Sequence, residues 1–97
     1  MYSDVVREAK NEREIYFLLS SYVEAVRFGD LLNLVPEPVK RLPLEGYGHV
    51  KEHYQQLLEL EKASEGMTTN ACGVIREALP IFNAALERLE SLGDKHN

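Results

Sequence analysis

The residues best suited to chemistry stand together in the stretch 49–53, which reads HVKEH. On a helix, His49 and His53 lie about one turn apart, so both imidazoles could ligate a metal ion such as zinc. Glu52, between them, could then polarise a metal-bound water. This spacing makes His49, Glu52 and His53 a candidate metal or small-ligand site.

The spacing resembles the H-x-x-E-H pattern of inverted zinc metallopeptidases, and the resemblance covers only residues 49–53. A zinc site needs a further ligand, which here would be a carboxylate, His96 or Cys72. The simpler expectation is that His49 is an ordinary first-turn residue and that His53 belongs to the inward or boundary face of the helix. Metal binding is the alternative.

Two other groups carry possible chemistry. Cys72 is the only cysteine and falls in the first turn of an expected helix, where the helix dipole favours a thiolate. No spacing specifies a general base for it, so we expect a small structural hydrophobe. Lys40 and Arg41 form the only adjacent basic pair, and we expect them in a solvated loop. The sequence therefore predicts no catalytic residue and no cofactor.

Composition narrows the classes of partner. The chain has 97 residues, enough for one domain, and its 11 Lys and Arg against 16 Asp and Glu give a net charge of −5. Because no basic stripe is present, we expect neither nucleic acid nor a membrane as partner. The longest apolar run, 15–19, is too short to cross a bilayer, and residues 1–14 are too charged for a signal peptide. With a single cysteine, these features favour a cytoplasmic location.

Apolar residues recur at steps of three and four along three segments, which predicts a single all-helical domain over 1–97. We expect helices at about 4–28, 48–65 and 69–92, packed as a bundle. Asn11, with Glu14 three residues later, marks a second possible helix start. Only a few residues around Gly66 separate the last two helices, so these should form an antiparallel hairpin.

Prolines shape two further parts of the expected fold, the connector and the last helix. The connector from Gly29 to Gly48 contains three prolines and seven apolar residues, which favours an extended path with local turns. It is long enough for the first helix to run in either direction relative to the second. Pro80 falls inside the last helix but faces outward and leaves the apolar stripe in phase, so we expect one curved helix.

The apolar faces of the expected helices are too extensive for one short chain to cover. We therefore expect a non-enzymatic interaction or regulatory module that pairs with itself as a homodimer, or with another helical protein. The first and third helices would carry the contact, through Ile15, Leu18, Tyr22, Leu79 and Leu86. The alternative is a small-ligand or metal-binding protein that uses His49, Glu52 and His53.

Overall fold

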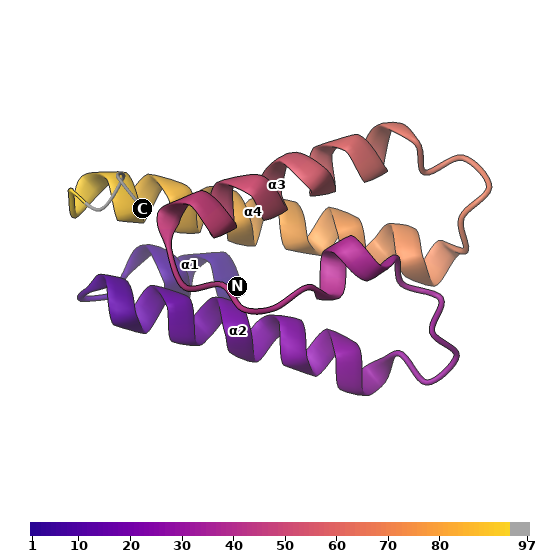
Figure 1. Cartoon of the computed structure of the whole chain (residues 1–97), viewed down its shortest axis with the longest axis horizontal. Helices are drawn as coiled ribbons and strands as arrows, with labels where there is room; N and C mark the ends of the chain where they lie inside the picture. Colours follow the sequence, from indigo (N-terminus) through magenta and orange to yellow (C-terminus); the bar gives the residue numbers. More distant parts are fainter. Residues whose placement is uncertain (94–97) are drawn as a thin grey trace.

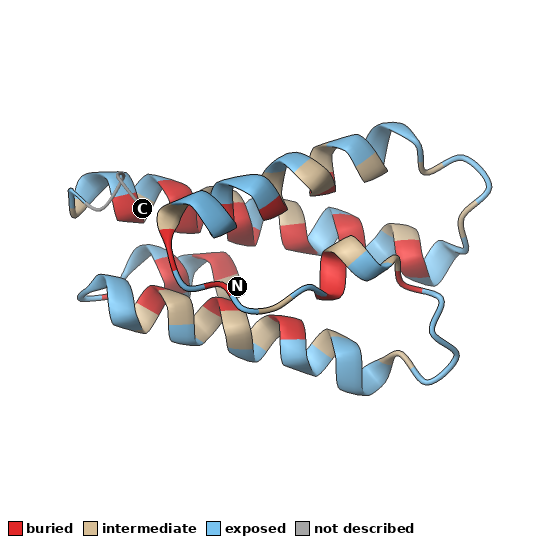
Figure 2. Ribbon diagram, in the orientation of Figure 1, coloured by how far each residue is buried: buried red, intermediate tan, exposed pale blue. Residues whose placement is uncertain are grey.

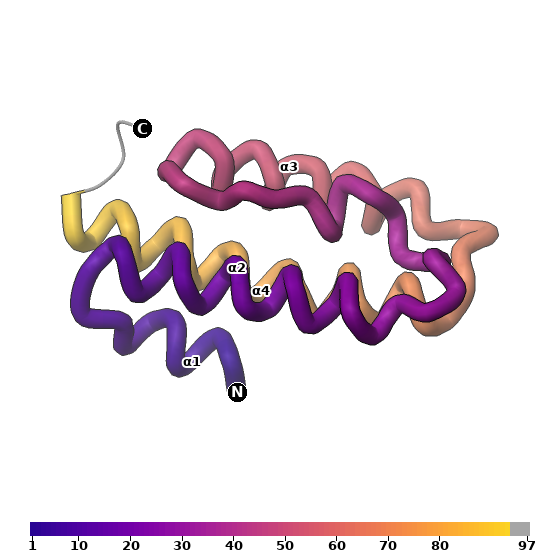
Figure 3. The backbone as a smooth tube through the Cα atoms, turned by 60° about the horizontal axis from the view of Figure 1, so that its bottom comes forward, coloured from indigo at the N-terminus to yellow at the C-terminus, as the bar shows by residue number. Residues whose placement is uncertain are grey.

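The computed structural model describes residues 1–93, and within that range it contains four α-helices, one 3-10 helix and no strand (Figure 1). The elements are α1 (Tyr2–Arg7), α2 (Glu12–Gly29), η1 (Glu37–Lys40), α3 (Tyr47–Lys62) and α4 (Thr69–Ser91). α3 and α4 run antiparallel, whereas α2 runs parallel to α3 (Figures 1 and 3). The predicted all-helical bundle and its antiparallel hairpin are confirmed.

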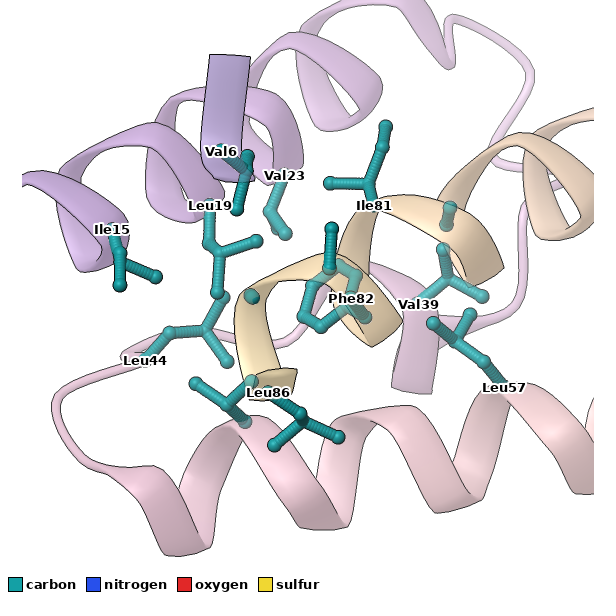
Figure 4. Packing of buried hydrophobic residues seen from close by; sticks show 14 of the residues in the cluster. Val6, Ile15, Leu19, Val23, Val39, Leu44, Leu57, Ile81, Phe82 and Leu86 are labelled. Atoms are coloured by element: carbon teal, nitrogen blue, oxygen red, sulfur yellow. The ribbon is translucent and has the colours of Figure 1, made fainter. Parts of the chain in front are cut away.

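The core lies where α1, α2 and α3 face α4, and Figure 2 shows the buried residues gathered on these inner sides. The predicted apolar stripe of α4 is fully buried at six positions, Ala71, Ile75, Ala78, Phe82, Ala85 and Leu89. Phe82 lies at the centre of this core, with Val39 of η1 and Leu57 of α3 beside it (Figure 4). Helical periodicity thus located the core because burial here follows the helix repeat.

The first predicted helix is wrong in one respect: it divides into α1 and α2. Asn11 begins α2 as its N-cap and accepts a hydrogen bond from the Glu14 backbone N at 2.9 Å. The Arg88 Nε donates to the Ala9 carbonyl at 2.8 Å and thereby ties the turn to α4. A continuous helix would have placed Glu12 on the buried stripe, and the break leaves Glu12 exposed.

The connector returns along the bundle from the end of α2 to the start of α3 (Figure 1). It contributes Val35, Val39 and Leu44 to the core, so it covers one side of the helical bundle. One turn of 3-10 helix, η1, interrupts its otherwise irregular path, in agreement with the predicted local turns. This path makes α2 and α3 parallel, a direction that the sequence left open.

The expectation that Lys40 lies in a solvated loop is wrong. Its Nζ lies 2.9 Å from the Asp30 carboxylate, and the two side chains are only 7% and 3% exposed. Asp30 also accepts hydrogen bonds from the backbone N–H groups of Leu34 and Val35. The hydrogen bond from Lys40 holds the pKa of Asp30 below its usual value. This pair closes the loop after α2, because an unpaired charge at either position would be buried.

α4 continues through Pro80 without interruption, and Pro80 is exposed, as the sequence predicted.

Residues 1–93 include no helix that combines the length and the apolar character needed to span a bilayer.

Candidate functional site

The candidate residues of the H-x-x-E-H stretch meet at one surface pocket with a volume of about 210 Å³. The first three turns of α3 form one side of this pocket, and the end of the connector forms the other. The lining residues are Arg41, Leu42, Pro43, Leu44, His49, Glu52, His53 and Gln56. The structure therefore brings the three predicted residues to one place and adds an apolar wall and a cation from the connector.

His53 is the buried member of this group, at 3% exposure. Its ring stacks on Phe82, with 4.3 Å between the centroids and 7° between the planes. Burial lowers the pKa of His53 to about 4, a hydrogen bond with the Val39 backbone partly offsets this, and the Arg41 charge lowers it further. His53 is therefore neutral at pH 7. Its Nε2 is closed to solvent and has no hydrogen-bond partner among residues 1–93.

His49 lies at the exposed rim of the pocket. Its Nδ1 accepts a hydrogen bond from the backbone N of Glu45 at 3.3 Å. A neutral imidazole has one N–H, so this bond places the proton of His49 on Nε2. Nε2 is then a hydrogen-bond donor, whereas a metal ligand there would need an unprotonated nitrogen.

The geometry gives little support to the metal alternative. No three His, Cys, Asp or Glu side chains within residues 1–93 are grouped so that they could hold a metal ion. The Sγ of Cys72 donates to the Ser64 carbonyl at 3.7 Å, at the opposite end of α3 from His49. His96, the other suggested ligand, lies outside the described residues.

Two opposite charges at the pocket have no ionic partner within the described chain. Arg41 and Glu52 are both exposed, and neither takes part in a salt bridge with residues 1–93. Beside them, Leu42, Pro43 and Leu44 provide an apolar surface. The pocket thus combines one cation, one anion and one buried imidazole with an apolar wall.

The residues predicted to form a protein interface do not lie on an open face. Ile15 is fully buried and Leu86 is 9% exposed within a single chain. Leu18, Tyr22 and Leu79 are partly buried and pack against the same core. The prediction is corrected at Ile15 and Leu86, because α1 and the connector cover apolar surface that the sequence left without a cover.

Most of the large exposed apolar side chains of residues 1–93 lie elsewhere, on the outer side of α2 and in the loop that follows it. Phe17 is 67% exposed and Phe28 87%, while Leu31 and Leu32 are 89% and 77% exposed. The sequence reasoning missed these residues. The available signal was that Phe17 and Phe28 stand off the apolar stripe and are spaced three helical turns apart.

Comparisons with protein-family models, curated proteins and solved structures found no match to this chain, so the functional argument depends on its own residues and geometry.

Proposed function

We propose that this protein is a non-enzymatic interaction module that pairs with a second copy of itself through the outer face of α2. The observation that carries the proposal is the exposure of Phe17 and Phe28 on one side of one helix. Exposed apolar groups that gather on one face mark interaction sites more often than isolated ones do.

The outer face of α2, defined as Phe17, Ser21, Glu24 and Phe28, is self-complementary. At 100° per residue these four positions fall within an arc of about 60°, and all four are exposed. In an antiparallel pair related by a two-fold axis, each Phe17 lies opposite the partner's Phe28. The Ser21 hydroxyl lies opposite the partner's Glu24 carboxylate and can donate to it. The two-fold axis therefore forms each of these two pairings twice, so all four positions of both copies have a partner.

The surface beside each phenylalanine has a shallow depression. Phe17 borders a hollow that Tyr16, Ser20 and Leu44 also line. Phe28 borders another, with Glu24 and Arg27. Because the antiparallel arrangement brings each ring to the partner's corresponding hollow, both rings can be covered on association.

The area involved is appropriate to a weak dimer. With roughly 200 Å² per aromatic side chain, the exposed parts of Phe17 and Phe28 amount to about 300 Å² per copy. Both copies together supply about half of the roughly 1,200 Å² at the lower limit of stable interfaces. Leu31 and Leu32, in the loop after Phe28, are exposed apolar residues that can add to this area. We therefore expect dissociation in the micromolar range.

The loop that carries Leu31 and Leu32 is already ordered. Asp30 holds it through Lys40 and through two backbone N–H groups, and Asn33 adopts a left-handed conformation with φ of 51°. A surface that is ordered before binding loses less conformational entropy on association. This preorganisation supports a contact role for the loop.

Sedimentation velocity over a range of micromolar concentrations tests the proposal. The wild-type chain should dimerise, and the double variant Phe17→Ser, Phe28→Ser should remain monomeric with unchanged helical content, because both rings are exposed. Val5→Ser is the matched control, since Val5 is a half-exposed apolar residue on α1. A wild-type chain that stays monomeric throughout, or a double variant that still dimerises, would overturn the proposal.

A further inference from the structure

The pocket between α3 and the connector is separate from the outer face of α2 and contains polar groups that the fold leaves unused. The Nε2 atom of His53 is the strictest case, because a buried polar atom without a hydrogen bond destabilises the folded chain. Nε2 itself is closed to solvent, so the polar side chains that a ligand in this pocket can reach are those of Arg41, His49 and Glu52.

The remaining polar groups require opposite charges from the ligand. Arg41 calls for an anion, and the Nε2–H of His49 at the same rim is a further donor for it. Glu52 calls for a cation with N–H groups. An ammonium group satisfies Glu52, and a carboxylate satisfies Arg41 and His49.

We propose that this pocket binds a free α-amino acid with an apolar side chain. The ammonium group faces Glu52, the carboxylate faces Arg41 and His49, and the apolar side chain packs on the wall formed by Leu42, Pro43 and Leu44. Each of the three parts of the ligand has a counterpart of matching chemistry in the lining.

The volume of the pocket also limits the ligand to the size of a single amino acid. A volume of 210 Å³ corresponds to about seven water molecules at about 30 Å³ each. This is below the roughly 300 to 1,000 Å³ of pockets that hold drug-sized molecules. A single amino acid fits this limit, whereas a nucleotide or a folded peptide segment does not.

Isothermal titration calorimetry with L-leucine and its two half-analogues tests the proposal. 4-Methylpentanoate lacks the ammonium group, and 3-methylbutylamine lacks the carboxylate. We expect L-leucine, or failing that L-valine, L-isoleucine or L-methionine, to bind, and each half-analogue of the binding amino acid to bind at least about tenfold more weakly, because each leaves one charge of the pocket unpaired. Equal binding of either half-analogue would overturn the zwitterion assignment. No binding by any of the four amino acids up to about 10 mM would overturn the site.

Surface variants locate the binding without disturbing the fold. Arg41→Gln and Glu52→Gln each remove one exposed charge of the pocket and should weaken amino-acid binding at least about tenfold. Glu59→Gln is the matched control, because Glu59 is an exposed carboxylate on the same helix outside the pocket, and it should bind as the wild type does. Unchanged binding in both pocket variants would contradict the proposal. The measurement is repeated in the Phe17→Ser, Phe28→Ser chain, where binding should persist because the pocket lies within one copy.

Discussion

His53 is the residue at which packing and polarity conflict most directly. Its ring fills core space against Phe82, yet one of its nitrogens has no partner within the described chain. Protonation would add a charge to a site that excludes water and lies near Arg41, so the pKa of His53 falls to about 4. The same burial that positions the ring therefore keeps it neutral.

This shift predicts a pH dependence of stability. The folded pKa of about 4 lies below the ordinary pKa of 6.5, so between these values the unfolded chain binds more protons. The contribution of His53 is fully present above pH 6.5 and is lost as the pH falls toward 4. The unfolding free energy should drop by on the order of 3 kcal/mol across this window. Urea titrations at intervals between pH 7 and pH 4 measure it.

The variant His53→Phe provides the control, because it keeps a ring against Phe82 and removes the titration. The adjoining pocket gives the larger ring room. Its unfolding free energy should change less between pH 6.5 and 4.5 than that of the wild type. The comparison concerns slopes, since the variant also removes a donor from the Val39 backbone. Parallel pH profiles for the two proteins would contradict the assignment.

The sequence predicted part of the pocket because part of it is local. The spacing of His49, Glu52 and His53 on one helix is enough to bring them to one region. The cation and the apolar wall come from residues 41–44, whose position depends on how the connector packs. No periodicity specifies that path, so sequence reasoning did not join Arg41 to the histidines.

At the scale of elements, the connector depends on the buried pair of Asp30 and Lys40. Lys40→Met keeps the length of the side chain but leaves the Asp30 carboxylate without its cation. We expect the melting temperature to fall by at least about 10 °C, because removing one partner of a buried pair leaves an uncompensated charge. Circular dichroism melts at pH 7 measure the change.

A second substitution separates charge from packing at this site. Adding Asp30→Leu to Lys40→Met removes both charges and should recover part of the lost stability. Recovery should be incomplete, because the Leu34 and Val35 N–H groups lose their acceptor. A double variant less stable than Lys40→Met alone would show that the pair does not act through charge.

Two glycines should respond to the same substitution in opposite directions. Gly73 lies within the helix α4, and a Cβ atom added there would have no atom within 4 Å. Gly73→Ala should therefore raise the unfolding free energy by roughly 0.5 to 1 kcal/mol. Gly66 has a φ of 92° in the turn between α3 and α4, so Gly66→Ala should lower stability despite equal space. Chemical denaturation of both variants tests the pair, and changes of the same sign would contradict it.

The element boundaries show which parts of the fold a local pattern can predict. α3, α4 and most of α2 follow their apolar repeats, because their burial has the period of the helix. The break between α1 and α2 follows no glycine or proline. Its local signal is Asn11, the N-cap of α2, whereas the hydrogen bond that ties the break to α4 comes from Arg88, 79 positions away from the carbonyl it binds. Burial of Lys40 depends likewise on a partner ten positions away within an irregular segment. Such contacts arise from tertiary packing.

At the scale of the whole molecule, the net charge of −5 opposes pairing of two copies. If apolar contact at the outer face of α2 drives association, added salt should screen this repulsion and tighten the dimer. We expect the dissociation constant to fall several-fold between about 10 and 150 mM NaCl, as measured by sedimentation equilibrium. A dimer held mainly by ion pairs would weaken instead, which would contradict an apolar contact.

The two-fold arrangement makes a specific prediction about which positions meet. In a Cys72→Ser background, the single variants Phe17→Cys and Phe28→Cys should each form few intermolecular disulfides when oxidised alone. Mixed together, they should cross-link efficiently, because antiparallel helices place position 17 opposite the partner's position 28, within the roughly 4 to 7 Å between Cα atoms that a disulfide needs. Non-reducing electrophoresis measures the yield. A parallel pair would instead join like positions, so efficient cross-linking of Phe28→Cys alone would reject the antiparallel register while leaving self-association intact.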